Sequence, residues 1–323
     1  MLTRLMTAAV FSCLLASPVL AQTVPDTKSV RVCTGGKSGN YFWAGSEIAK
    51  RFSPDLFTSA TLVNTNGSLT NLRRLTSNDV TERCDIGFSQ SDVMNQFQVE
   101  YPGTHEQIGL LKIAYTEYVH IVCPVASGWN TLSDIADAKG TRKMIVGPDG
   151  SGTAETWRIM RQADSKKYDA IQRDPSPADY SSAHTVADSK DTCMLWVSGL
   201  NSNDMKSANT LSLRNAAGKP ALRLISINDT KMLTIKGQDG LPLYKINTIS
   251  PIIPQNGKPG LYDNLIPNGW FSTSVDLIGI SAYIMIRNDY KVAMPRDRLA
   301  RLLEAIDDAQ PTIWARVNPA GSN

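Results

Sequence analysis

Four short segments rich in Gly, Ser, Thr and Asn each follow a predicted strand and precede a predicted helix. They are TGGKSGNY at 34–41, NTNGSLTN at 64–71, SQSD at 89–92 and GPDGSGT at 147–153. Gly lets the backbone approach a ligand, and a helix N-terminus offers unpaired N–H groups and the positive end of its dipole. Together these features favour binding of a small anion, most simply a carboxylate.

Aromatic side chains near these segments are further candidates for the wall of a binding site. Tyr41 and Phe42 lie one helical turn beyond the first segment. Tyr115 and Tyr118 come just before a predicted crossover, and Trp196 lies at the end of a predicted strand. All of them are also compatible with packing in the hydrophobic core, so the sequence leaves open which of them face a ligand.

Catalytic signatures are weak in this chain. The segment GPDGSGT resembles a phosphate loop but lacks the Lys-Ser/Thr ending, and TGGKSG lacks the GxGxxG spacing. The three histidines, His105, His120 and His184, lie neither in an HExxH motif nor near a GxSxG elbow. The acidic residues are scattered over predicted helix faces and loops. We therefore expect a protein that is not an enzyme and has no cofactor.

Composition is typical of a folded protein. The chain has 323 residues, 33 of them Lys or Arg and 30 Asp or Glu, which gives a net charge of +3, and 42% are hydrophobic. This length allows two domains of roughly 150 residues each. The near-neutral charge and the absence of a basic run exclude an electrostatic footprint for nucleic acid.

The N-terminus predicts export. Arg4 precedes an apolar stretch at 5–15, Pro18 breaks it, and Ala21 ends a small-residue cleavage site, so residues 1–21 read as a secretory signal peptide. A membrane anchor is the alternative, but the apolar run falls short of the ~20 residues that span a bilayer. We expect a mature chain that is periplasmic and does not itself span the membrane.

Export changes the interpretation of the cysteines. Cys33, Cys84, Cys123 and Cys193 remain after cleavage, and an even number in an oxidising compartment favours disulfides. The preferred pairing joins Cys33 to Cys84 and Cys123 to Cys193, because it keeps each bridge inside one predicted lobe. The other connectivities and four free thiols remain open. No Cys/His cluster is present, so we expect no metal site.

Strand and helix patterns alternate along most of the chain. The residue types and hydrophobic spacing predict strands at 29–33, 60–63, 85–88, 110–114, 119–125, 143–146, 193–197, 222–227 and 275–287. Helical spacing follows the strands that end near residues 33, 63, 88 and 146, and an amphipathic helix is predicted at 297–317. We expect residues 236–274 to be irregular, with one or two short strands.

This order predicts an α/β protein with two lobes, each a mostly parallel sheet flanked by helices. Extended segments near residue 120 and at 275–287 would connect the lobes, and the ligand would bind in the cleft between them. We assign residues 22–118 together with about 235–323 to the first lobe, and about 119–234 to the second.

The motifs TGGKSGNYFWAG, NTNGSLTNLRRL, DIGFSQSDV and GPDGSGTAETW, in this order in an exported chain, resemble the TAXI family. Its members are the solute receptors of a class of TRAP transporters. The likeness runs from about residue 29 to 208 and is looser from 209 to 323. It implies a type II periplasmic binding-protein fold that closes on a ligand.

The resemblance also implies a ligand, a partner and a set of contacts. Family ligands are small acids such as glutamate and related dicarboxylates, which the receptor delivers to a TRAP-type membrane permease driven by an ion gradient. Matching motifs place ligand contacts at Thr34, Gly36, Tyr41, Asn66, Ser68, Gln90 and Ser91 in the first lobe and at Ser151, Gly152 and Thr153 in the second.

Lys37 and Ser38 stand where the family commonly has smaller residues. Lys37 is placed either to pair with an acid or to point to solvent. We add Lys37, Ser38, Tyr115 and Trp196 to the candidate ligand contacts and expect a monomer. Service to an ATP-driven transporter or a sensor kinase is the main alternative function, and a periplasmic enzyme on the same fold is the other.

Overall fold

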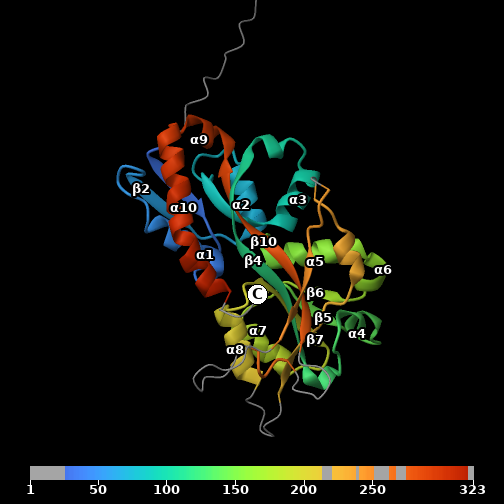
Figure 1. Ribbon diagram of the computed structural model, residues 1–323. Helices are drawn as coiled ribbons and strands as arrows, with labels where there is room; N and C mark the ends of the chain where they lie inside the picture. Colours follow the sequence, from blue (N-terminus) through green and yellow to red (C-terminus); the bar gives the residue numbers. More distant parts are fainter. Residues whose placement is uncertain (1–25, 213–219, 238–239, 251–261, 267–273, 319–323) are drawn as a thin grey trace, which may run out of the picture.

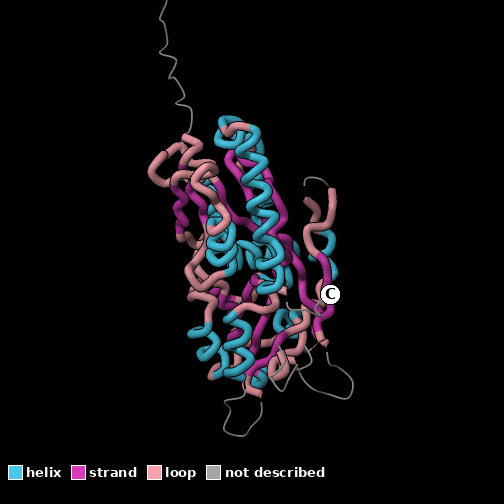
Figure 2. The backbone as a smooth tube through the Cα atoms, turned by 60° about the vertical axis from the view of Figure 1, so that its left-hand side comes forward, coloured by secondary structure: helices cyan, strands magenta, loops and turns pink. Residues whose placement is uncertain are grey.

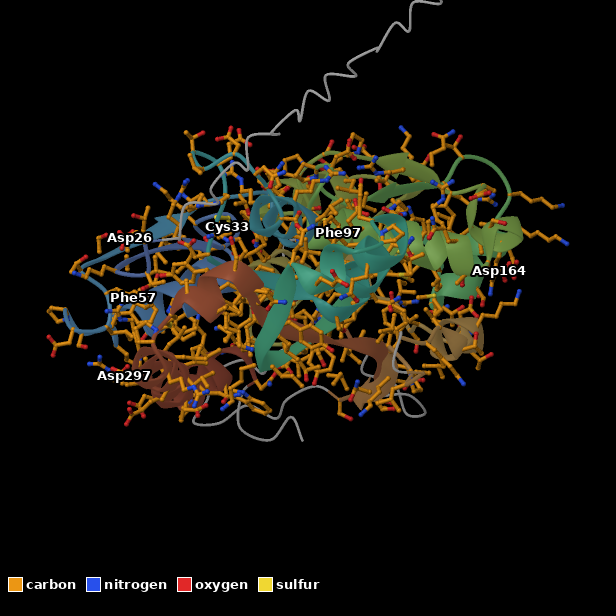
Figure 3. The ribbon with its side chains drawn as sticks, turned by 90° about the horizontal axis from the view of Figure 1, so that it is seen from above. Asp26, Cys33, Phe57, Phe97, Asp164 and Asp297 are labelled. Atoms are coloured by element: carbon orange, nitrogen blue, oxygen red, sulfur yellow. A yellow bond between two sulfur atoms is a disulfide. The ribbon has the colours of Figure 1, made fainter. Side chains whose placement is uncertain are left out.

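The computed structural model describes residues 26–212, 220–237, 240–250, 262–266 and 274–318. Two lobes lie one above the other, and two long strands, β4 and β10, run through both (Figure 1). Seen from above, Asp26, Phe57 and Asp297 lie toward one end of the molecule and Asp164 toward the other (Figure 3). The signal peptide expected at residues 1–21 lies outside the described residues.

The first lobe begins with three βα units, as the strand and helix patterns predict. Their elements are β1 (Ser29–Cys33), α1 (Asn40–Ala49), β2 (Ser59–Val63), α2 (Ser68–Leu75), β3 (Ile86–Gln90) and α3 (Ser91–Glu100). One detail of the prediction is wrong: Ser89 and Gln90 belong to the strand and Ser91 already begins the helix. No loop therefore separates β3 from α3.

The first crossover is a single strand. The sequence predicts two strands, at 110–114 and 119–125, but β4 extends without interruption over Ile108–Pro124 after a short 3-10 turn, η1 (Thr104–Glu106). Its partner β10 (Val275–Arg287) pairs with it antiparallel from Ile108 to Val119. This continuous ladder satisfies the backbone between the two predicted segments, so the chain has no reason to break there.

The second lobe contains more short elements than the sequence pattern indicates. They are η2 (Val125–Ser127), α4 (Leu132–Asp137), β5 (Lys143–Ile145), α5 (Gly152–Ala163), α6 (Ser165–Tyr168), β6 (Gln172–Asp174), α7 (Tyr180–Ala187), β7 (Thr192–Ser198), α8 (Asn203–Ser212), β8 (Leu222–Leu224), η3 (Thr230–Thr234) and β9 (Lys245–Ile249). The sequence analysis did not predict β6 or the helices α6, α7 and α8. Part of the region at 236–274, expected to be irregular, lies outside the described residues.

The strands form one continuous sheet in the order β2-β1-β3-β10-β4-β7-β5-β6. β2, β1 and β3 are mutually parallel in the first lobe, and β7, β5 and β6 are mutually parallel in the second. The antiparallel pair β10 and β4 lies between these two groups. The predicted arrangement of two mostly parallel α/β lobes joined by extended crossovers is confirmed.

The C-terminal part of the chain returns to the first lobe. After β10 come α9 (Asn288–Ala293) and the long helix α10 (Arg296–Val317), which lies along the strands of this lobe (Figure 2). Leu302, Ile306 and Ile313 pack with Val30 and Ile284 in one core cluster. The predicted amphipathic face therefore covers the first sheet.

Packing also indicates where the return crossover lies. Tyr244, Ile278 and Ile280 pack with residues of the second lobe, and so does Tyr262, whereas Ile284 packs in the first. We therefore propose that the chain re-enters the first lobe inside β10, near Ala282, rather than near residue 235.

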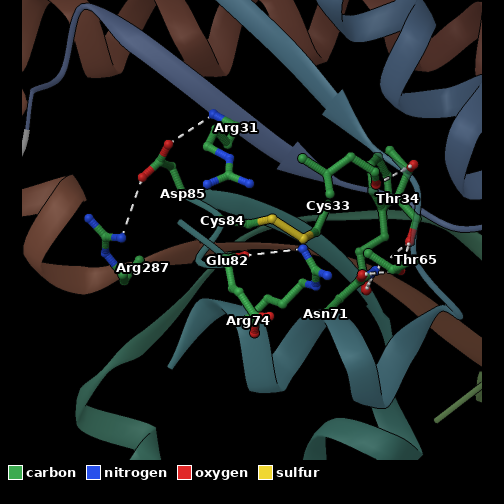
Figure 4. The surroundings of a disulfide bond; sticks show 12 residues. Arg31, Cys33, Thr34, Thr65, Asn71, Arg74, Glu82, Cys84, Asp85 and Arg287 are labelled. Atoms are coloured by element: carbon green, nitrogen blue, oxygen red, sulfur yellow. Dashed lines mark hydrogen bonds and ion pairs between the residues drawn. A yellow bond between two sulfur atoms is a disulfide. The ribbon is translucent and has the colours of Figure 1, made fainter. Parts of the chain in front are cut away.

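Two disulfides join the four cysteines in the preferred pairing. Cys33 is bonded to Cys84, with the Cα atoms 5.8 Å apart, and Cys123 is bonded to Cys193, with the Cα atoms 4.3 Å apart. All four residues are fully buried. Figure 4 shows the first bridge between the end of β1 and the residue that precedes Asp85. Each bridge stays within one lobe, so neither opposes relative movement of the lobes.

Candidate functional site

A cavity of about 340 Å³ lies between the two lobes. Its wall is made by the turns that follow the parallel strands of both lobes, which is where open α/β sheets bind ligands. The lining residues are Gly35, Gly36, Ser38, Gly39, Asn40, Tyr41, Thr65, Asn66, Gly67, Ser68, Gln90, Glu117, Pro148, Ser151, Gly152, Thr153, Pro177, Ala178, Asp179, Trp196, Val197, Ser198, Ser202 and Asp204.

The N-termini of the helices α1, α2 and α5 are among those that contribute to this wall. Gly39 and Gly67 are the N-cap residues of α1 and α2, and no side chain caps either helix. Ser151 is the N-cap of α5, where its Oγ accepts a hydrogen bond of 3.1 Å from the amide of Ala154. The first amides of a helix have no intrahelical acceptor and carry the positive end of the dipole. The cavity therefore offers donors suited to a carboxylate from both lobes.

The lobes touch at the rim of the cavity. The Thr70 amide donates to the Gly150 carbonyl over 3.3 Å, and Asn66 Nδ2 donates to the Asp149 carbonyl over 3.4 Å. A Cβ on Gly152 would lie 2.1 Å from Gln90 Oε1. The start of α5 thus packs directly against the first lobe, and a side chain at Gly152 would require Gln90 to move.

A buried polar contact joins the lobes beyond the cavity. Asp92 on α3 is fully buried, and its Oδ2 accepts hydrogen bonds from Thr156 Oγ1 on α5 (2.8 Å) and from the Tyr244 hydroxyl (2.9 Å). Burial raises the pKa of this carboxyl. Both donors compensate part of the desolvation of Asp92, so the contact ties α3 to the second lobe without exposing a charge.

Glu117 on β4 lines the cavity and is one of the residues that the sequence analysis missed. Its side chain is only 4% exposed, and its Oε2 accepts a hydrogen bond of 3.0 Å from the Tyr41 hydroxyl. Burial raises the pKa of Glu117 to about 8, although the hydrogen bond from Tyr41 acts in the opposite direction. The carboxyl is therefore mostly protonated at neutral pH. The only signal in the sequence was an acidic residue between the two strands predicted at 110–114 and 119–125.

Two further acidic residues lie on the second-lobe side of the cavity. Asp179 is the N-cap of α7 and accepts hydrogen bonds from the amides of Ser181 and Ser182. Asp204 on α8 has a raised pKa because it is desolvated and because Asp179 is close. Among the described residues that line the cavity, none is Lys or Arg. The wall therefore combines positive helix ends with three carboxyl groups.

Most of the predicted contacts come together in this cavity. Gly36, Ser38, Tyr41, Asn66, Ser68, Gln90, Ser151, Gly152, Thr153 and Trp196 all line it. Tyr41 stacks on Phe88 with a distance of 5.3 Å between the ring centroids, and the backbone N–H of Gln90 donates to Ser68 Oγ over 3.2 Å. These contacts hold the first-lobe side chains in place.

Four of the candidate ligand contacts do not line it, and neither do the aromatic candidates Phe42 and Tyr118. Thr34 is fully buried, and its Oγ1 donates to the Val63 carbonyl over 3.0 Å. Lys37 is exposed to solvent, and Tyr115 is fully buried in the first-lobe core. Ser91 lines a different hollow, beside Thr116 and Ser281. The loop around residue 35 presents its Gly residues to the cavity and turns its larger side chains away from it.

Asn71 connects two of the turns to strand β3 and was also missed by the sequence analysis. Its Nδ2 donates to the carbonyls of Thr34 (2.7 Å) and Phe88 (2.8 Å). Thr65 Oγ1 lies 2.6 Å from Asn71 Oδ1 and accepts from the Gly67 amide, so the same network reaches the start of α2 (Figure 4). The network fixes the turns after β1 and β2 relative to strand β3.

Other kinds of site find little support in the part of the chain that the structure describes. Within it, no group of three or more His, Cys, Asp or Glu residues is arranged to hold a metal ion. Across the same residues, no helix has the length and apolar character that crossing a bilayer requires.

Comparisons with known proteins agree with this fold. The sequence model of the NMT1-like family matches residues 32–240. A solved structure described as a periplasmic transporter superposes with a TM-score of 0.51 at 9% identity, covering 90% of this chain and 86% of the other. A search of curated proteins found no match.

Two further solved structures are more distant. One comes from work on glutathione import by GshT and the cystine ABC importer TcyBC of Streptococcus mutans, with a TM-score of 0.45, 12% identity, and coverage of 90% of this chain and 94% of the other. The other is the alkanesulfonate-binding protein SsuA from Xanthomonas axonopodis pv. citri bound to MOPS, with a TM-score of 0.45, 14% identity, and coverage of 91% and 76%.

Proposed function

We propose that this chain, which belongs to the NMT1-like family, is an exported receptor that binds a small organic acid or amino acid between its two lobes. The observation that carries the proposal is the cavity of about 340 Å³ walled by helix N-termini from both lobes. A ligand that contacts both lobes stabilises the closed state through its differential affinity for that state. The receptor releases its ligand unchanged.

Delivery to a TRAP-type membrane permease is the second part of the proposal. It rests on the resemblance of the four motifs, TGGKSG, NTNGSLTN, SQSD and GPDGSGT, to those of TAXI receptors. Affinity capture of the ligand-loaded receptor with solubilised membranes from its own source tests this part. Recovery of permease subunits of the TRAP type supports it, whereas recovery of an ATP-driven importer or a sensor kinase contradicts it.

Binding is tested by thermal shift on residues 22–323 after unfolding and refolding to remove carried-over ligand. The screen contains small carboxylic acids and the common amino acids. A ligand that binds only the native state and is present at 1,000 times its Kd stabilises the protein by about 4 kcal/mol. We expect a clear rise in Tm with a few chemically related acids.

The control is a check by circular dichroism that the stripped protein has refolded. If no acid or amino acid shifts the Tm of refolded protein, the proposed ligand class is wrong. If a ligand is chemically altered on incubation with catalytic amounts of the protein, the protein is an enzyme rather than a receptor.

A further inference from the structure

The charges that line the cavity are unevenly distributed. Glu117 lies on β4, and Asp179 and Asp204 come from α7 and α8. A ligand with only carboxylates would meet these groups without a Lys or Arg among the described lining residues to balance them. Like charges in a partly desolvated site repel one another and favour neutralisation or a counter-ion.

Asp204 is an acidic lining residue whose charge no described residue compensates. Its carboxyl has no hydrogen bond or ion pair with any described residue, and burial, together with the proximity of Asp179, raises its pKa. One carboxyl oxygen of Asp179, Oδ1, accepts hydrogen bonds from the amides at the start of α7. A positively charged group in the cavity would interact favourably with both.

Glu117 completes the acidic lining. The titratable groups that face it are Tyr41 on α1, Asp92 on α3 and Tyr115 on its own strand, and Gln90 on β3 is a neutral neighbour. None of them is a cation, so without a ligand the carboxyl is held neutral by its surroundings. A cation placed beside it would favour the ionised form.

We propose that Glu117 is a specificity-determining residue that selects a ligand carrying a protonated amine, with the helix N-termini of α1, α2 and α5 receiving its carboxylate. The ligand class is then a zwitterionic amino acid. This inference rests on the proposed receptor function and narrows it. As the ammonium group binds, the neutral carboxyl of Glu117 gives its proton to solvent and the resulting carboxylate pairs with the ammonium.

The first test compares each amino acid that binds with its deaminated analogue, for example L-glutamate with glutarate and L-alanine with propionate. Loss of one hydrogen bond to a charged group weakens binding by about 10- to 100-fold. We expect the analogue to bind more weakly by that factor. An analogue that binds as tightly as its amino acid overturns the inference and leaves the receptor function standing.

The second test measures protons. Titration calorimetry of the wild-type protein with the bound amino acid, in two buffers of different ionisation enthalpy, gives the number of protons released on binding. Because the pKa of Glu117 is about 8, we expect release of about one proton per ligand at pH 6.5 and much less at pH 9. No release at pH 6.5, with affinity falling above pH 8, would show that neutral Glu117 donates to an acid group, which contradicts the proposal.

The third test uses Glu117→Gln, which keeps the shape and removes the ionisable group. We expect a 10- to 100-fold weaker affinity for the amino acid and no proton release. The matched control is Glu304→Gln, which makes the same change on the exposed face of α10. Unchanged affinity in Glu117→Gln overturns the inference.

If Glu117→Gln fails to fold, two measurements still test whether the ligand carries an amine. One is the number of protons that the wild-type protein releases on binding, and the other is the amino-acid affinity of Asp204→Asn, on the opposite wall of the cavity. If the refolded protein binds neither amino acids nor other acids, the proposed receptor function itself is wrong. If it binds the amine-free analogue as tightly as the amino acid, only the role of Glu117 is wrong.

Discussion

His120 illustrates how a single buried group influences this protein. It is fully buried on β4, and its Nε2 lies 3.0 Å from the Tyr262 hydroxyl, which donates to the Leu200 carbonyl over 2.8 Å. Because that hydroxyl proton is already committed to Leu200, the imidazole Nε2 is the donor to Tyr262. Burial lowers the pKa of His120 to about 4. The folded protein therefore holds this ring neutral where the unfolded chain would protonate it.

We expect this ring to make the protein less stable in mild acid. Between pH 6.5 and about 4 the unfolded state binds the proton and the folded state does not, so the His120 contribution is lost as pH falls through this range. At pH 5 the loss relative to pH 7 is about 2 kcal/mol. Urea unfolding of wild type and His120→Gln at both pH values measures it as the difference between their pH dependences.

The wild type must be compared with His120→Gln because Glu117 changes the stability in the opposite direction as the pH falls. Its raised pKa adds stability that is complete below pH 4.5 and is lost as pH rises through 8. The matched control is His184→Gln, which changes an exposed histidine on α7. If His120→Gln keeps the full pH dependence of the wild type, His120 is not the responsible group.

Among the elements, the strand ends are held by covalent bonds as well as by the sheet. Cys33 lies at the end of β1, and Cys84 precedes β3 by two residues, while Cys123 and Cys193 belong to β4 and β7. The two loops that they close span sequence separations of 51 and 70 residues. Both bridges constrain the unfolded chain within one lobe.

We expect Cys33→Ala with Cys84→Ala, and separately Cys123→Ala with Cys193→Ala, to lower the free energy of unfolding by about 2–4 kcal/mol each. Ligand affinity should stay unchanged, because neither bridge connects the moving lobes. Urea titration and calorimetry on the same preparations measure the two quantities. A folded variant that has lost its affinity would show that a bridge also shapes the cavity.

At the scale of the whole molecule, the two lobes meet where α2 contacts the loop before α5. A Cβ built on Gly150 lies 3.9 Å from the Cβ of Thr70, across the gap between the lobes. That separation falls within the range of about 3.5–4.5 Å found in disulfides. The same two residues form the backbone hydrogen bond at the rim.

We expect the double variant Thr70→Cys with Gly150→Cys to lock the lobes together when oxidised. Gly150 has a φ of +83°, so a side chain there adds strain of about 1–2 kcal/mol. Ligand added after oxidation should bind far more slowly than after mild reduction, which spares the fully buried native bridges. Stopped-flow binding measures both rates, and each single Cys variant is the control. Equal rates in the oxidised and reduced forms would show that ligand enters without separation of the lobes.

Local patterns of the sequence were sufficient for most elements. Alternating and continuous apolar runs identified the strands at 29–33 and 275–287 because short-range spacing is enough to define a strand. The Gly-rich turns were found because Gly and Ser mark helix starts wherever they occur. The preferred cysteine pairing is confirmed by both disulfides.

The cavity depended on information that no local pattern contains. Glu117 and Tyr115 are two residues apart on β4, yet Glu117 lines the cavity and Tyr115 is buried in the first-lobe core. Sequence reasoning chose Tyr115 because an aromatic side chain is a common wall residue. Asp179 and Asp204 were missed because the helices α7 and α8 that carry them were not predicted.

By itself, then, the sequence determined most of the strands and helices, the Gly-rich turns and the arrangement of two lobes, because these follow from spacing and turn chemistry along the chain. Only the tertiary structure decided which residues meet in the cavity and with what charge. Positions from Gly35 to Asp204 converge there, and the register of β4 against β10 decides which side chains of the crossover face inward.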